Sequence, residues 1–172
     1  MVETKVNLEE KPLSKNSKLP KYSNVKSMDP EYLAEELGMA KAWEPFGAEV
    51  EYLTPKDLVK FEVKVVNNKL VDVEGIPIDS GNTNNGKVMF VMDPDGNIYS
   101  GEQRVMEFHH SSFLAGKDVA SAGELMIFDG EILSHSRRSG HYKPTQEQHQ
   151  QFISQLKTNG IDLSNIPEET VD

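Results

Sequence analysis

Between residues 62 and 136, apolar residues occur in short runs separated by turn-forming sequences. The runs flank Asn67-Asn68, Pro94-Asp95-Gly96 and Asp129-Gly130, and each combines β-branched or aromatic residues with a turn signal typical of a hairpin. The clearest examples are KVMFVMDPDGNIYSG and GELMIFDGEILSHS. We therefore predict three antiparallel hairpins, with a loop rich in Gly, Pro and Asn at 75–86 between the first two.

A different spacing, typical of amphipathic helices, occurs at both ends of this region. After Thr145, which forms a capping box with Gln148, apolar residues and His149 recur at i, i+3, i+4 and i+7 and predict a helix that ends before Gly160. Near the N-terminus, Asp29 and Pro30 precede a similar pattern and predict a helix over about 30–42. The residues expected on the buried faces are Leu33, Leu37, Ala40, His149, Phe152, Ile153 and Leu156.

Two shorter segments complete the expected elements. Thr54 and Pro55 predict one or two helical turns over 54–61, and IDLSNI at 161–166 predicts a short terminal strand. Together the elements predict an α+β fold, in which a mostly antiparallel sheet of hairpins has one helix before it and one near the C-terminus. Residues 1–28 are polar and lysine-rich, so we expect a leader that is mobile or lies across a single domain formed by 29–172.

Charge and composition exclude several classes of protein. Acidic residues outnumber basic ones 28 to 18, for a net charge of −10, which argues against a nucleic-acid partner. No apolar run approaches the roughly 20 residues that span a bilayer, and no cysteine is present. The N-terminus lacks the apolar core of a signal peptide, so we expect a soluble protein that is cytoplasmic or delivered by a non-classical secretion route.

The segment FHHSSFLAG, residues 108–116, is the main candidate for chemistry. Interpreted as a strand, it places His110 and Ser112 on one face and His109 with Ser111 on the other. His110 is then a candidate base with Ser112 as its hydroxyl partner, and His141 a second candidate across the sheet. The alternative is a structural role, because a buried imidazole needs hydrogen-bond partners for both ring nitrogens.

Other kinds of site fit the sequence less well. The chain has no G-x-S-x-G elbow of the kind that serine hydrolases use. His109, His110, His135 and His141, with oxygen from Glu124 or Asp129, lack the spacing of a zinc site, and we expect no metal.

Glu124 follows small residues at the start of a predicted strand, where a ligand can approach the backbone. A glutamate beside a histidine and a serine matches the arrangement that promotes ADP-ribosyl transfer, in which the carboxylate stabilises the developing positive charge. Arg137 and Arg138 are candidates to bind an anionic group, and Ser111 and Tyr142 to line the same pocket. NAD is then a candidate substrate, no cofactor is expected, and a solvent-exposed Glu124 is the alternative.

Several motifs in order resemble a known family. FHHSSFLAG, AGEL, DGEIL, SGHYKPT and FISQLKTNGIDLSNI resemble the plant IQ-motif calmodulin-binding proteins of the IQM type, with their fungal and bacterial toxin-like or effector-like relatives. The resemblance extends from about residue 50 to 166, and no counterpart is recognised for 23–48. The family pattern has Gln in place of His109 and Arg in place of Glu124. The positions that match it are His110, Ser111, Ser112, Phe113, Gly116, Gly123, Ser139, Gly140, His141 and Tyr142.

The resemblance implies two functions. One is an effector-like or toxin-like domain with a His/Ser/Tyr-lined pocket acting on a nucleotide such as NAD. The other is a non-catalytic module that binds an unidentified protein or host target. The basic I-Q-x-x-x-R-G-x-x-x-R pattern by which the plant proteins recruit calmodulin does not occur in these 172 residues, so calmodulin is not implied.

Overall fold

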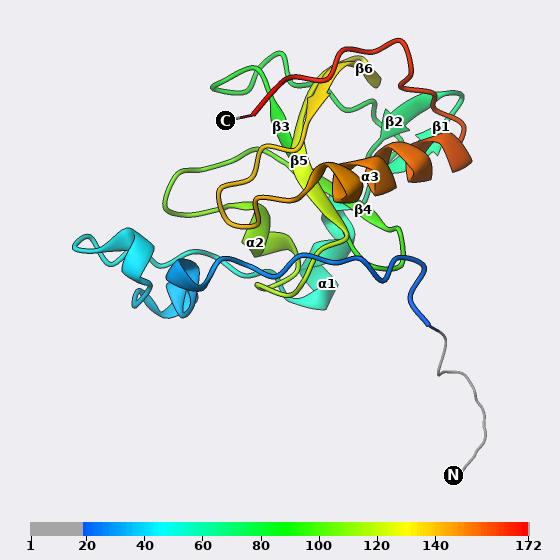
Figure 1. Ribbon diagram of the computed structural model, residues 1–172. Helices are drawn as coiled ribbons and strands as arrows, with labels where there is room; N and C mark the ends of the chain where they lie inside the picture. Colours follow the sequence, from blue (N-terminus) through cyan, green and yellow to red (C-terminus); the bar gives the residue numbers. More distant parts are fainter. Residues whose placement is uncertain (1–18, 172) are drawn as a thin grey trace.

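The computed structural model describes residues 19–171 as an α+β fold around a four-stranded antiparallel sheet (Figure 1). The strands are β3 (Val88–Met92), β4 (Ile98–Gly101), β5 (Ser121–Phe128) and β6 (Glu131–Ser136), in the order β4-β3-β5-β6. A separate two-stranded sheet pairs β1 (Lys64–Val66) with β2 (Lys69–Val71). All three predicted hairpins are confirmed.

The hairpin turns form where the sequence supplies residues that tolerate a positive φ. Asn67 and Asn68 have φ of 52° and 65°, and Asp129 and Gly130 have φ of 50° and 78°. Two consecutive positive φ angles define the type I′ turn, whose twist matches that of the strands it joins. The β5-β6 pair continues past this turn through a register shift at Met126/Ile127.

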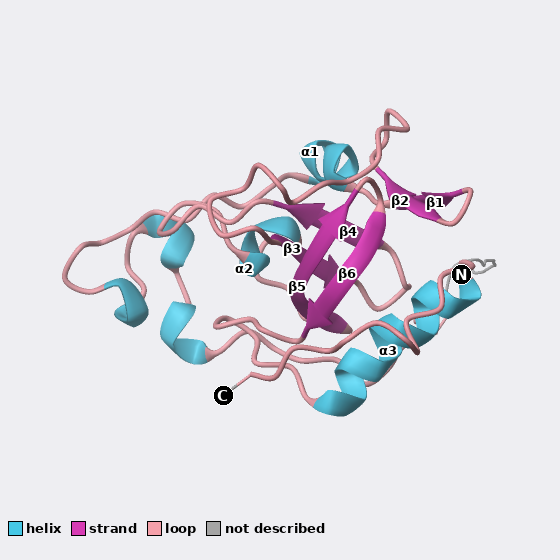
Figure 2. Cartoon of the chain, turned by 90° about the horizontal axis from the view of Figure 1, so that it is seen from above, coloured by secondary structure: helices cyan, strands magenta, loops and turns pink. Residues whose placement is uncertain are grey.

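The sheet carries a hydrophobic core on each face because β3 is buried on both sides. Phe90 on one face packs against Phe152 and Leu156 of helix α3 (Gln146–Thr158), with the rings of Phe90 and Phe152 stacked 3.8 Å apart. Met89 and Val91 face the opposite core, which contains Phe113 of the short helix α2 (His110–Phe113), Phe108 and Tyr142. Figure 2 shows α3 running along the sheet. The capping box and the buried face predicted for α3 are confirmed, with Ile153 only partly buried.

The helix predicted over 30–42 is wrong. Three separate 3₁₀ turns occupy Pro30–Tyr32, Glu35–Leu37 and Lys41–Trp43. Ala34 and Gly38 adopt left-handed φ angles of 65° and 75°, which interrupt any continuous helix. The residues buried here are Glu35 and Ala40, whereas Leu33 and Leu37 are exposed. We call residues 29–49 the strap; its turns lie at the end of the molecule remote from α3 (Figure 2).

The remaining segments are mostly irregular. The predicted turns after Thr54 are confirmed as α1 (Pro55–Leu58) followed by a 3₁₀ turn at Val59–Phe61. The terminal strand predicted at 161–166 is wrong, because those residues form turns and the chain pairs only later, through a bridge between His135 and Glu168. Within residues 19–171, no helix combines the length and the apolar content that crossing a membrane requires.

The expected leader lies partly outside the described residues, since 1–18 fall outside them. Residues 19–28 form no helix or strand, but two backbone contacts attach them to the rest of the chain. The Tyr22 amide donates to the Pro94 carbonyl at 2.8 Å, and Lys26 pairs with Val119 in an antiparallel bridge.

Candidate functional site

The segment predicted as a strand at FHHSSF folds instead as the single helical turn α2, so the strand prediction is wrong. The Ser112 hydroxyl accepts the N–H of His109 at 3.0 Å, which stabilises the start of the turn. All four residues of α2 are buried. Because they belong to a helix, their side chains point in different directions and do not alternate between two faces.

His110 points toward strand β5. Its Nε2 lies 2.7 Å from the carbonyl oxygen of Gly123. A carbonyl can only accept, so Nε2 carries the proton and Nδ1 of the neutral ring carries a lone pair. Burial lowers the His110 pKa to about 4, so the ring is neutral at pH 7 and Nδ1 is available as a hydrogen-bond acceptor.

Ser111 points the opposite way, toward the strap. Its hydroxyl donates to Oε2 of Glu35 at 2.6 Å, and Tyr52 donates to the same oxygen at 2.8 Å. Oε1 of Glu35 accepts from His141 Nε2 at 2.8 Å and from Trp43 Nε1 at 3.2 Å. Glu35 is fully buried, so its carboxylate has exchanged water for four protein donors.

These donors keep the buried carboxylate ionised. Burial raises the Glu35 pKa, but the hydrogen bonds from His141, Ser111 and Tyr52 outweigh it and hold the pKa below its usual range. Burial and the adjacent carboxylate raise the Tyr52 pKa far above 10, so Tyr52 remains a donor at any physiological pH. Glu35 therefore fixes the strap to α2 and to the loop containing His141.

Aromatic rings from the strap stack against two of the histidines. Tyr32 stacks on His141 with centroids 3.8 Å apart, and His141 stacks on His109 at 4.8 Å. Trp43 lies 5.1 Å from the His109 ring. The Met106 N–H donates to His109 Nε2 at 3.0 Å, and the Gln103 side-chain amide lies 3.1 Å from the other ring nitrogen, Nδ1.

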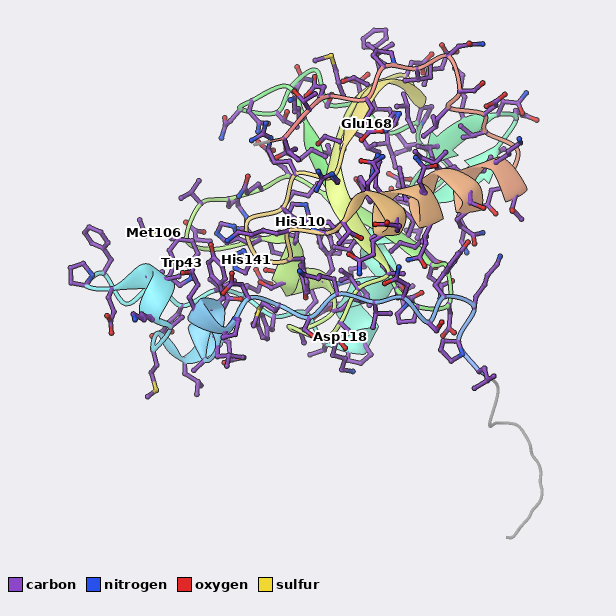
Figure 3. All side chains as sticks on the ribbon, in the orientation of Figure 1. Trp43, Met106, His110, Asp118, His141 and Glu168 are labelled. Carbon is purple, nitrogen blue, oxygen red and sulfur yellow. The ribbon has the colours of Figure 1, made fainter. Side chains whose placement is uncertain are left out.

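A cavity of about 260 Å³ lies between the strap, α2 and β5. Three of the four residues predicted as catalytic line it: His110, Glu124 and His141. Figure 3 shows Trp43 beside His141. Burial raises the Glu124 pKa, and Arg138 Nε lies 3.8 Å from its carboxylate. The cavity can therefore offer a neutral imidazole, a carboxylate and a guanidinium to one small ligand.

The other predicted site residues have partners elsewhere. Ser112 caps α2, and Ser111 is bonded to Glu35. Arg137 donates to the Pro144 carbonyl at 2.8 Å, and the buried Tyr142 donates to the Lys117 carbonyl at 2.7 Å. None of these four lines the 260 Å³ cavity.

Glu35, Tyr32, Trp43 and Tyr52 are site residues that the sequence did not predict. The expected helix over 30–42 placed Glu35 opposite Leu33 and Leu37, where an acidic residue is ordinarily solvated. Nothing in the local sequence distinguishes Glu35 from its neighbour Glu36, which is exposed.

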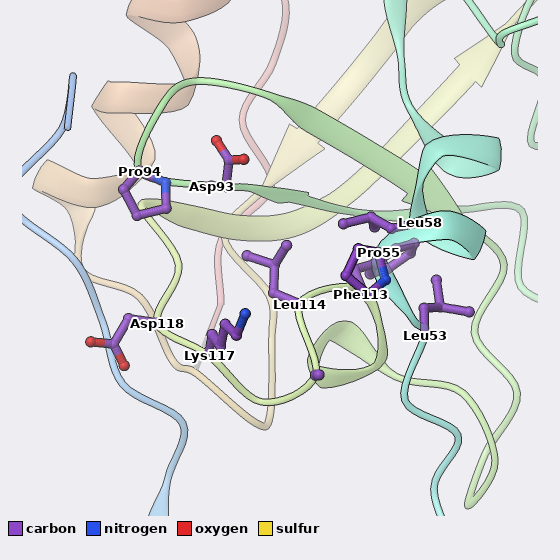
Figure 4. A pocket seen from close by; sticks show the side chains of 10 residues that line it. Leu53, Pro55, Leu58, Asp93, Pro94, Phe113, Leu114, Lys117 and Asp118 are labelled. Carbon is purple, nitrogen blue, oxygen red and sulfur yellow. The ribbon is translucent and has the colours of Figure 1, made fainter. Parts of the chain in front are cut away.

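A larger cavity of about 590 Å³ lies on the other side of α2 (Figure 4). Phe113 and Leu114 line it together with Leu53, Pro55 and Leu58. Its lining is mainly apolar, and Asp93, Lys117 and Asp118 are its charged residues. It lacks the histidines and Glu124, and so lacks the acid–base groups of the smaller cavity.

Acidification is expected to destabilise the fold through the buried histidines. The unfolded chain binds protons at His109 and His110 below about pH 6.5, whereas burial lowers both pKa values to about 4 in the folded state. The unfolded state therefore binds more protons between pH 6.5 and 4, and the unfolding free energy falls as pH falls, by up to about 3 kcal/mol per histidine. Glu35, with its lowered pKa, adds to the loss below pH 4.5, and Glu124, with its raised pKa, opposes it.

Urea unfolding at pH 7.0, 5.5 and 4.5 measures this dependence. His110→Gln, whose amide can still donate to the Gly123 carbonyl, is expected to unfold with a shallower pH slope than wild type. An unfolding free energy that stays constant from pH 7.0 to 4.5 would contradict the assignment of neutral histidines.

Comparison with known proteins places the chain in a family. Residues 57–149 match the model of the IQ motif-containing protein middle domain. IQ domain-containing protein IQM5 of Arabidopsis thaliana is 33% identical over 123 residues, which are 72% of this chain and 25% of that protein. IQ domain-containing protein IQM1 of the same plant is 34% identical over 117 residues, 68% of this chain and 24% of that protein.

The chain thus spans about a quarter of the length of the curated relatives it matches. No solved structure matches it. The matched segment contains α2, β5, His110, Glu124 and His141, whereas the strap lies before it. The chain belongs to the IQ motif-containing protein family, of which it carries the middle domain.

Proposed function

We propose that this chain is a protein-interaction domain whose partner binds the outer surface of the strap. The observation that carries the proposal is the exposure of four large apolar side chains within 14 consecutive residues, with Leu37 and Phe46 exposed by 66% and 76%. Such a concentration is typical of a recognition surface rather than of isolated exposed residues. The four are Leu33, Leu37, Met39 and Phe46.

The inner side of the strap supports this proposal. Glu35, Tyr32 and Trp43 hold the strap in place through contacts with Ser111, His141 and His109, respectively. The outer surface of the strap is therefore presented in a defined conformation. Interactions that order a surface before binding reduce the entropy lost on association.

The charge of the strap indicates the kind of partner. Besides the buried Glu35, residues 29–49 include five acidic residues against the single base Lys41. The five are Asp29, Glu31, Glu36, Glu44 and Glu49. Charge complementarity therefore favours a partner whose apolar patch is bordered by Lys or Arg. Calmodulin is not expected to bind, because the IQ pattern is not part of these 172 residues.

Affinity capture with the full chain tests the proposal. A partner captured by wild type should be lost with Leu37→Ser/Phe46→Ser, and its affinity, once purified, should fall at least tenfold. The matched control is Val59→Ser/Val66→Ser, which removes exposed apolar side chains outside the strap and should leave binding unchanged. Equal binding by both double variants would refute the strap as the contact surface. Calmodulin, with and without calcium, is included as a separate ligand.

A second candidate function is binding or turnover of a nucleotide such as NAD. The observation in its favour is that His110, Glu124 and Arg138 line one cavity. A cavity of about 260 Å³ is below the usual range of roughly 300–1,000 Å³ for small-molecule sites, so it would take one end of such a ligand. Calorimetry with NAD and assay of nicotinamide release, using wild type and Glu124→Gln, test it. Absence of both binding and release would eliminate this function.

A further inference from the structure

Two buried histidines and a glutamate meet at the edge of the sheet that β6 forms. His135 is on β6, His149 is in the first turn of α3, and Glu168 belongs to the C-terminal segment. One ligand atom from each lies within 4.8 Å of the other two. Figure 3 shows Glu168 on the segment that passes β6. None of these residues lines the 260 Å³ cavity.

Backbone pairing brings the carboxylate to the histidines. The His135 N–H donates to the Pro167 carbonyl at 3.2 Å, and the His135 carbonyl accepts from the Glu169 N–H at 2.7 Å. These two bonds hold the C-terminal segment in register with β6. The Gln146 carboxamide donates to Glu168 Oε1 at 3.2 Å and orients that side chain. The positions of His135, His149 and Glu168 are therefore set by the backbone of β6, of α3 and of the C-terminal segment.

The two imidazoles face each other directly. Nδ1 of His135 and Nε2 of His149 are 2.9 Å apart, and both side chains are almost completely buried. His135 also donates a hydrogen bond to the Ile166 carbonyl, so the single proton of its neutral ring lies on the nitrogen that faces this carbonyl and not on Nδ1. His135 Nδ1 thus presents a lone pair toward His149 and Glu168.

We propose that His135, His149 and Glu168 form a binding site for a divalent transition-metal ion of the Zn²⁺ class. Two imidazole nitrogens and one carboxylate oxygen are ligands that zinc accepts, whereas calcium and magnesium prefer sites made only of oxygen. Three protein ligands leave a fourth position for water. Glu168 is exposed, so the ion can enter from the surface.

The surrounding hydrogen bonds indicate the strength of this site. The bond from His135 to the Ile166 carbonyl fixes its ring in the way that outer partners usually support metal ligands. His149 differs, because its Nδ1 is buried without a hydrogen-bond partner among the described residues. Metal at Nε2 would place the ring proton on this Nδ1, which costs binding energy. We therefore expect a dissociation constant in the micromolar range.

Isothermal titration of the tag-free full chain with ZnCl₂ after treatment with EDTA tests the proposal. Saturable binding of one ion is expected, and Co²⁺ should give the visible absorption of a site with nitrogen ligands. Glu168→Gln alters only an exposed side chain and should weaken binding at least tenfold, and His149→Phe should abolish it. Glu147→Gln is the matched control, since it removes an exposed carboxylate two residues from His149 and should bind as wild type does.

Circular dichroism establishes that each variant is folded before titration. No saturable binding of Zn²⁺ below 1 mM by wild type would overturn the proposal. Binding of unchanged affinity by either Glu168→Gln or folded His149→Phe would also overturn it, by placing the ion at other residues.

Discussion

Gly123→Ala is expected to destabilise the chain severely, by more than about 4 kcal/mol in urea unfolding. A Cβ at this position would lie 1.8 Å from the carbonyl oxygen of Ser136 and 2.8 Å from the ring of Phe90. The closest obstacle is backbone of the paired strand β6, which cannot move without breaking the sheet. Movement of β5 would also displace the carbonyl that accepts from His110.

Gly140→Ala is the control for this substitution. Gly140, like Gly123, is one of the positions that match the family pattern. A Cβ added at Gly140 would meet only the Tyr32 hydroxyl, at an ordinary contact distance of 3.6 Å. We expect Gly140→Ala to change the unfolding free energy by less than about 1 kcal/mol. A Gly123→Ala variant as stable as Gly140→Ala would show that β5 and β6 do not approach each other this closely.

Glu35→Gln is expected to release the strap. The amide has nearly the size of the carboxylate, but its NH₂ group would face donors: Tyr52 and Ser111 at one oxygen position, or His141 and Trp43 at the other. Breaking a buried charged network by altering one partner costs about 3–5 kcal/mol. We expect faster hydrogen exchange of the amides of 34–50. Trp43 is the single tryptophan of the chain, so its fluorescence should shift to the red as it loses its contacts.

The matched control is Glu36→Gln, which makes the same chemical change at the exposed neighbouring residue. It should leave the Trp43 emission unchanged and the unfolding free energy within about 0.5 kcal/mol of wild type, as is usual for surface substitutions. If Glu35→Gln also left both unchanged, Glu35 would not be the residue that holds the strap.

The sequence predicted the elements that depend on neighbouring residues. The turn at Asp129-Gly130 and the capping box of Thr145 with Gln148 act within a few positions, so the hairpins and α3 followed from them. The strap and α2 depend on contacts across the fold. Ser111 and Glu35 are 76 residues apart, and no local pattern shows that an acidic residue on the polar side of a supposed helix will be buried.

The sequence indicated some residues of the candidate site but not the local structure that positions the others. His110, Glu124 and His141 were expected to lie together, and all three line one cavity. Ser112 and Tyr142 have the residue types of a site, but they form hydrogen bonds that cap α2 and bind the Lys117 carbonyl. The capping role of Ser112 follows from the helical turn at 110–113, which the interpretation as a strand did not include.

The hydrogen bond between Glu35 and His141 also affects how the chain folds during synthesis, because its two partners are far apart in the sequence. The two residues are 106 positions apart. At about 5–20 residues per second, a ribosome needs roughly 5 to 20 s to synthesise the segment between them. During that interval the strap emerges with its apolar side chains, while Glu35 still lacks its hydrogen bond from His141 and, for most of the time, the one from Ser111. The nascent chain therefore presents the exposed apolar side chains of the strap before the residues that hold the strap in place are made, and chaperones or the partner itself can bind it before the domain is complete.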